Sequence, residues 1–140
     1  MSGTPERQQV IDWLTGTIEG VVGPDGEFEI NPSGEPASFP AIYAEESDQS
    51  ADDTTEPGAT RYELEFGLEG YVSGGSGIEA TTARSELYDA LITAILDATS
   101  WPDCIEEIHE GDMRLSTATL AAARRLGFNL TVTIHFVAPR

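Results

Sequence analysis

Apolar and polar residues alternate strictly along two stretches of the chain, 61–72 and 128–137. The apolar members are Tyr62, Leu64, Phe66, Leu68 and Val72 in the first stretch, and Phe128, Leu130, Val132, Ile134 and Phe136 in the second. Successive side chains of a strand point to opposite faces, so a period of two indicates one packed face and one polar face. Both stretches are therefore predicted to be strands of a mainly antiparallel sheet that is covered on one side.

Two other segments have the three- and four-residue spacing of apolar positions that predicts amphipathic helices. The first follows Pro5, which suits the first helical position, and Thr4 is its expected cap. The second runs over about 79–98, and Thr81 or Thr82 is its expected cap. Because a sheet with one apolar face needs a cover, both helices are expected to pack on that face.

The remaining elements are shorter. Strands are predicted at 27–30, 39–43 and 104–110. Segment 116–126 is rich in alanine and is interpreted either as a helix or as an extended lead-in to the last strand. The predicted fold class is α+β, with two main helices packed on one face of a mainly antiparallel or mixed β-sheet of about 4–5 strands. Residues 1–140 are expected to form a single domain.

Charge is the strongest feature of the composition. The chain has 25 Asp and Glu residues against 7 basic residues, all of them Arg, and a formal net charge of -18. Such a surface repels phosphate, which disfavours direct binding of nucleic acids and docking to anionic membranes. The acidic surface has four alternative explanations: it keeps the protein soluble, it binds a basic protein partner, it mimics DNA, or it lines a path along which DNA passes without adhering.

Acidic residues are densest in segment 45–60, which contains no basic residue. Its small polar spacers predict a long, mobile hairpin loop that projects from the sheet between two strands. A calcium-binding EF-hand loop requires Gly at its sixth position and Glu at its twelfth. Counted from Asp48, these positions hold Asp53 and Ala59, so the EF-hand pattern fails and only weak, nonspecific divalent binding is left open.

One cluster resembles a metal or acid–base site: Glu106, Glu107, His109, Glu110 and Asp112. In the metalloprotease helix motif, a second His follows the first by four residues, and this cluster lacks it. His135 could join the cluster only if the tertiary fold brought it there. The single cysteine, Cys104, excludes an intramolecular disulfide, and its pairing with His109 lacks a third, orienting group. We expect no catalytic residue, no cofactor and no metal ligand, and a chain that is not an enzyme.

Four stretches, taken in their order along the chain, carry a resemblance to a known family. They are 7–14 in the first helix, Phe39-Pro40-Ala41-Ile42-Tyr43 before the acidic segment, 62–72, and the helix 85–96 with the terminal strand 130–136. Together they resemble the tail-terminator (tail-completion) family of long-tailed phages. This family includes proteins like the minor tail protein U, and similar proteins are found in prophages and gene-transfer agents.

By this resemblance, the protein is expected to be a non-enzymatic virion protein that forms a ring, usually a hexamer. The ring of such a family caps the head-proximal end of the tail tube, ends polymerisation of the tube protein and offers the surface for joining the head. The expected partners are other copies of the chain, the tail tube protein and a head-completion or connector protein, with no membrane. DNA is expected to pass through the ring without specific binding, and assembly to occur in the bacterial cytoplasm.

A hexamer multiplies the formal charge of -18 sixfold, so subunits should resist association unless acids meet arginines or cations screen them. We therefore hypothesise that Arg61, Arg124 or Arg125 meets acids of a neighbouring subunit, and that acids of 45–60 line the lumen or rim of the ring. The candidate subunit or tube interface residues are Glu46, Asp48, Asp52, Asp53, Glu56, Arg61, Arg124 and Arg125. The alternatives left open are another head–tail connector or head-completion protein, an acidic DNA-mimic inhibitor, and a small enzyme with a helix-on-sheet fold.

Overall fold

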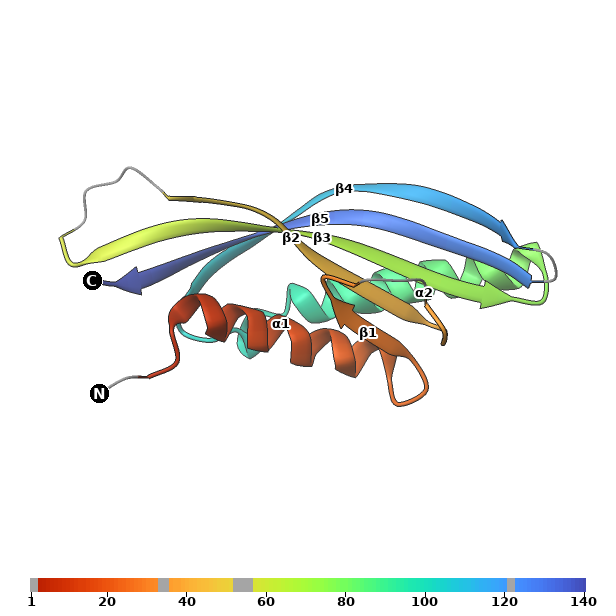
Figure 1. Ribbon diagram of the computed structural model, residues 1–140, viewed down its shortest axis with the longest axis horizontal. Helices are drawn as coiled ribbons and strands as arrows, with labels where there is room; N and C mark the ends of the chain where they lie inside the picture. Colours follow the sequence, from red (N-terminus) through yellow and green to blue (C-terminus); the bar gives the residue numbers. More distant parts are fainter. Residues whose placement is uncertain (1–2, 33–35, 52–56, 121–122) are drawn as a thin grey trace.

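The computed structural model describes residues 3–32, 36–51, 57–120 and 123–140, with the backbone alone for 116–120 and 123–124. Five strands form one sheet, and two helices lie together on one face of it (Figure 1). The other face of the sheet carries no helix among the described residues. This arrangement confirms the predicted α+β fold class.

The strands differ greatly in length. They are β1 (Glu27–Ile30), β2 (Ala41–Ala51), β3 (Ala59–Gly74), β4 (Ile105–Leu120) and β5 (Ala123–Pro139). β1 runs parallel to β2, and every other neighbouring pair is antiparallel, so the sheet is mixed. The order across the sheet is β1-β2-β3-β5-β4, so the short β1 forms one edge and β4 forms the other.

The two alternating stretches lie in β3 and β5, which pair along their whole length at the centre of the sheet. Leu64 lies opposite Ile134 and Phe66 opposite Val132, and all four side chains are fully buried. The alternation therefore predicted the buried face of both strands correctly. The apolar residues of β3 lie opposite those of β5, so they share one face of the sheet. Burying each such large side chain stabilises the fold by about 1.5–3 kcal/mol.

Helix α1 (Glu6–Val22) covers the sheet with Val10, Leu14, Ile18 and Val22, which share one face at helical spacing and are all buried. The residue before the first turn is Pro5, and no side chain caps this end of the helix. The predicted cap at Thr4 is therefore wrong by one position.

Helix α2 (Gly77–Ile95) begins earlier than predicted. Its N-cap is Ser76, whose Oγ accepts a hydrogen bond from the backbone N–H of Glu79 at 3.2 Å. Glu79 in turn accepts from the N–H of Gly75, so two otherwise unpaired donors are satisfied. Thr81 and Thr82, the two expected caps, both lie inside the helix instead.

The two ends of segment 45–60, which was predicted to be a loop, belong to strands β2 and β3. Residues 45–51 continue strand β2 and pair with β3 across a register shift between Glu46 and Asp48. The first four residues of β2 are buried and the rest are mostly exposed, because β2 and β3 extend past the helices (Figure 1). A strand there has no apolar layer to pack against, so its acids stay in solvent. The central part of the predicted loop, 52–56, lies outside the described residues.

The helical interpretation of 116–126 is also wrong. β4 runs to Leu120 and β5 begins at Ala123, so residues 116–120 and 123–126 belong to two paired antiparallel strands. The backbone of Ser116 lies opposite Gly127 and that of Thr117 opposite Leu126. Pairing with the neighbouring strand overrides the helix propensity of alanine, which is only a weak preference.

Candidate functional site

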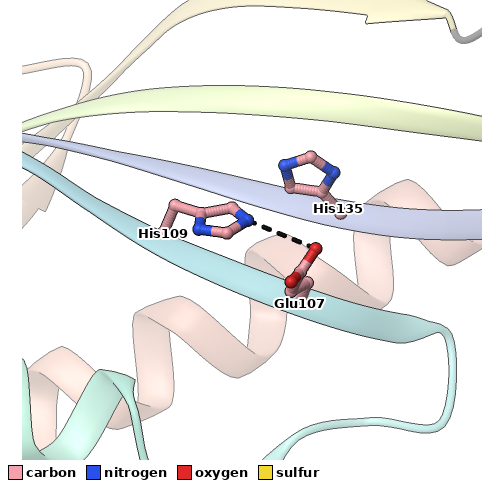
Figure 2. A group of neighbouring side chains, drawn as sticks. All are labelled: Glu107, His109 and His135. Carbon is pink, nitrogen blue, oxygen red and sulfur yellow. Dashed lines mark ion pairs between the residues drawn. The ribbon is translucent and has the colours of Figure 1, made fainter.

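Three side chains gather on the face of the sheet that is opposite the helices: Glu107, His109 and His135. Figure 2 shows them on neighbouring strands with the helices behind the sheet. Glu107 of β4 lies directly opposite His135 of β5 in the strand register. His109 follows Glu107 by two residues, so the pleat of β4 places it on the same face.

The polar atoms of this cluster, the Glu107–His109–His135 cluster, are close together. His109 Nε2 lies 3.2 Å from Glu107 Oε2, as the dashed line in Figure 2 marks. The two imidazole rings meet edge to face with centroids 5.0 Å apart. One ligand atom from each of the three residues lies within 4.8 Å of the others. His109 and His135 are also the only two histidines in the chain.

A fourth polar side chain stands beside the cluster. Glu63 of β3 lies opposite His135, and its Oε1 is 3.7 Å from His135 Nδ1. A row across three strands thus runs from Glu63 through His135 to Glu107. The side chain of His135 is 28% exposed and that of Glu107 is 62% exposed, so the row borders solvent.

The sequence pattern indicated Glu107 and His109 but did not join His135 to them. The period of two along each strand puts 107 with 109, and 133 with 135, on one face each. Which residue of β5 then faces Glu107 depends on the hairpin register, which contains shifts after Ile105 and after Glu110. No spacing pattern in the sequence predicts those shifts.

Two of the residues proposed for the interface have ion-pair partners within the chain. Glu46 Oε1 lies 3.0 Å from Arg7 Nη2 of α1, and Arg61 Nε lies 3.0 Å from Glu106 Oε1 of β4. Both pairs are partly exposed, and such pairs contribute only about 0–1 kcal/mol each. Their intramolecular partners orient these side chains without removing them from the surface.

Two further interface candidates make different contacts. Asp48 is exposed, and its Oδ1 accepts a hydrogen bond from the backbone N–H of Gln49 at 2.9 Å. The guanidinium of Arg125 lies over the ring of Phe39, 5.0 Å from its centroid. The Nε atom of Arg125 is buried and has no hydrogen-bond partner among the described residues. The other candidates lie outside the described residues, namely Asp52, Asp53, Glu56 and the side chain of Arg124.

Arg125 borders a hollow of about 710 Å³ on the face opposite the helices. Its lining includes Phe39, Tyr43, Tyr71, Arg114 and Arg125, together with the acids Glu45, Glu69 and Asp112. Tyr43 donates a hydrogen bond to Glu27 at 2.6 Å. Burial is the main cause that raises the pKa of Tyr43, and this hydrogen bond is the second. Tyr and Arg side chains are enriched among the residues that contribute most to protein–protein binding, so this hollow is suited to contact with another protein chain.

Cys104 does not pair with His109 as a nucleophile would. Its Sγ lies 3.9 Å from the carbonyl oxygen of Glu6 on α1, under the sheet, whereas His109 lies on the opposite face. Burial raises the pKa of the Cys104 thiol, which disfavours the reactive thiolate. Within the described residues, neither helix combines the length and apolar composition that crossing a membrane requires.

Comparison with known proteins finds a likeness of fold. No protein-family model and no curated protein sequence matches the chain. Among solved structures, it resembles a chain of the "Virion of native gene transfer agent (GTA) particle", with a TM-score of 0.50 and 12% sequence identity. The likeness covers 94% of this chain and 95% of that chain. At this identity the match shows a shared fold along almost the whole of both chains.

Proposed function

We propose that the chain is a structural virion protein that forms a ring at the head-proximal end of a tail tube. The ring ends polymerisation of the tube protein and provides the surface for joining the head, and the chain has no enzymatic role. The observation that carries this proposal is the likeness of fold to a gene-transfer-agent virion chain, which covers both chains almost completely. The resemblance of the sequence to tail terminators points independently to the same class of particle.

The charge distribution supports assembly controlled by electrostatics. Subunits of formal charge -18 repel one another, so a ring needs acids to meet arginines or needs screening by cations. Arg125 and Arg114 border the hollow on the helix-free face, where an acidic segment of a neighbouring subunit can be received. Acids on the lumen or rim would let DNA pass, because phosphate is repelled by like charge.

The edge strand β4 offers a second contact for another copy of the chain. It is 16 residues long, and an edge strand presents unpaired backbone groups to a neighbouring chain. Met113 and Leu115 of this strand are 37% and 63% exposed, so they offer apolar surface to a neighbouring chain. We propose that a second copy covers this edge in a head-to-tail arrangement, which closes into a ring.

The first test is the solution mass by light scattering at low and high salt. We expect a particle of six times 15.0 kDa, either at all salt concentrations or once salt screens the charge. Replacing Arg61, Arg124 and Arg125 together with Ala should weaken this assembly. Replacing Arg7, Arg84 and Arg140 together with Ala removes the same three positive charges elsewhere and is the matched control. Unchanged assembly of the first triple variant would show that its three arginines do not form the interface.

The second test adds the protein to polymerising tail tube protein. A terminator should shorten the tubes and appear at one end of each tube by electron microscopy. Binding to portal-side proteins without any effect on tube length would favour a head-completion or connector protein instead. Competition with DNA for a basic protein, without ring formation, would favour an acidic DNA mimic.

A further inference from the structure

We propose that Glu107, His109 and His135 bind one divalent transition-metal ion, with zinc as the preferred ion. This inference is independent of the proposed ring function. It replaces the sequence-based expectation of no metal ligand, because the register of β4 and β5 brings His135 to the other two residues. Figure 2 shows Glu107 and His109 pointing toward each other on β4, with the ring of His135 beside them on the neighbouring strand β5.

The spacing of the polar atoms suits a small tetrahedral ion. Zinc–nitrogen and zinc–oxygen bonds of about 2.0 Å set neighbouring ligand atoms about 3.3 Å apart. His109 Nε2 and Glu107 Oε2 are already 3.2 Å apart. One ligand atom of His135 lies within 4.8 Å of a ligand atom of each of the other two residues, so binding one ion requires the side chains to move closer together.

The types of ligand select the class of metal. Two imidazole nitrogens and one carboxylate form a donor set that zinc and neighbouring transition metals bind well. Magnesium and calcium prefer oxygen ligands in larger numbers, so they bind this set poorly. Three protein ligands leave one tetrahedral position for water, as in zinc sites that are open to solvent.

The fold holds the ligands on rigid elements. All three stand on paired strands, and His135 belongs to the central strand β5. Glu63 Oε1 lies 3.7 Å from His135 Nδ1, so a small rotation of the Glu63 side chain would let it accept a hydrogen bond from that nitrogen and orient the ring. Carboxylates that hold a metal-binding histidine in this way commonly raise metal affinity. Glu63 is therefore proposed as a positioning residue and not as a ligand.

The test is titration of the whole chain with zinc, followed by calorimetry, in the presence of excess magnesium. Magnesium is needed because a chain of net charge -18 attracts any divalent cation. We expect one zinc ion per chain, and binding that magnesium does not remove. His109→Gln, His135→Gln and Glu107→Gln should each weaken zinc binding by more than about tenfold, since even the loss of an outer partner costs that much.

Matched variants separate the site from the general charge. Glu86→Gln removes one exposed carboxylate from α2, on the other side of the sheet, and should leave zinc affinity unchanged. Glu63→Gln should weaken binding by about tenfold and keep the stoichiometry of one. In nuclear magnetic resonance spectra, the ring signals of the two histidines should both shift and reach their end point at one equivalent of zinc.

Two results would overturn the proposal. One is equal zinc affinity in the wild type and in the His109→Gln/His135→Gln double variant. The other is complete displacement of zinc by magnesium, which would reduce the effect to general attraction by the acidic surface. All substituted ligands are at least partly exposed, so circular dichroism should show an intact fold in each variant.

Discussion

Gly70 of β3 lies directly against the ring of Phe128 on β5. A Cβ atom at Gly70 would overlap two carbons of that ring. Phe128 is fully buried and also meets Tyr88 of α2 edge to face, with ring centroids 5.6 Å apart. The ring is therefore held from both sides, by the backbone of the sheet and by the helix above it.

Gly70→Ala should destabilise the fold, because either the ring or the β3 backbone must shift to admit the methyl group. We expect a loss of about 1–3 kcal/mol in the free energy of unfolding, the usual cost of overpacking. Urea denaturation measures this loss. Gly67→Ala is the matched control on the same strand, since a Cβ there meets nothing within 4 Å. Equal stability of the two variants would contradict the close packing of Gly70.

Ser76→Ala should remove the cap of α2. Its hydroxyl accepts from the N–H of Glu79, and loss of such a cap costs about 1 kcal/mol. Thr81→Ala lies inside the helix and should change the free energy of unfolding by no more than about 0.5 kcal/mol. Thermal unfolding of both variants distinguishes the two positions. A larger loss of stability in Thr81→Ala than in Ser76→Ala would instead support Thr81 as the cap, as the sequence alone predicted.

Stability should fall at high pH partly because of Tyr43. Burial, with the hydrogen bond to Glu27, raises the pKa of Tyr43 above its ordinary value of 10.0. In the unfolded chain the phenol ionises near that ordinary value, so above it the unfolded state loses its proton first. Stability from this group is thus complete below about pH 10 and declines as the pH rises further. Denaturant unfolding at about pH 9 and 11 should show a smaller decline for Tyr43→Phe than for the wild type.

Leu115→Glu should weaken self-association if a second copy covers the edge strand β4. The substitution places a charge on a side chain that is 63% exposed, so the isolated subunit should fold normally. Light scattering of the assembled protein should then report a lower mass. Leu96→Glu, at a 39% exposed position outside β4, is the control and should assemble as the wild type does. Assembly of Leu115→Glu equal to that of the control would move the interface away from β4.

The spacing of apolar residues along the chain, and the chemistry of neighbouring residues, were enough to predict much of this fold. The alternation around Phe66 and Val132 predicted two strands and their buried faces, since residues close in sequence decide which face is apolar. The capping spacing of Ser76 and Glu79 was also present in the sequence, and it would have located the start of α2 correctly. Ala118 and Ala123 lie in paired strands although alanine favours helices, because that preference is small beside the pairing of two long strands.

The sequence by itself determined that one face of a sheet is apolar, that two amphipathic helices cover it, and that the surface is strongly acidic. Only the tertiary structure decided which residues of different strands face each other. The meeting of His135 with Glu107 depends on hairpin register, and a shift of one residue would turn His135 into the core. Register is set by the sum of packing and backbone pairing over the whole sheet, so no local pattern contains it.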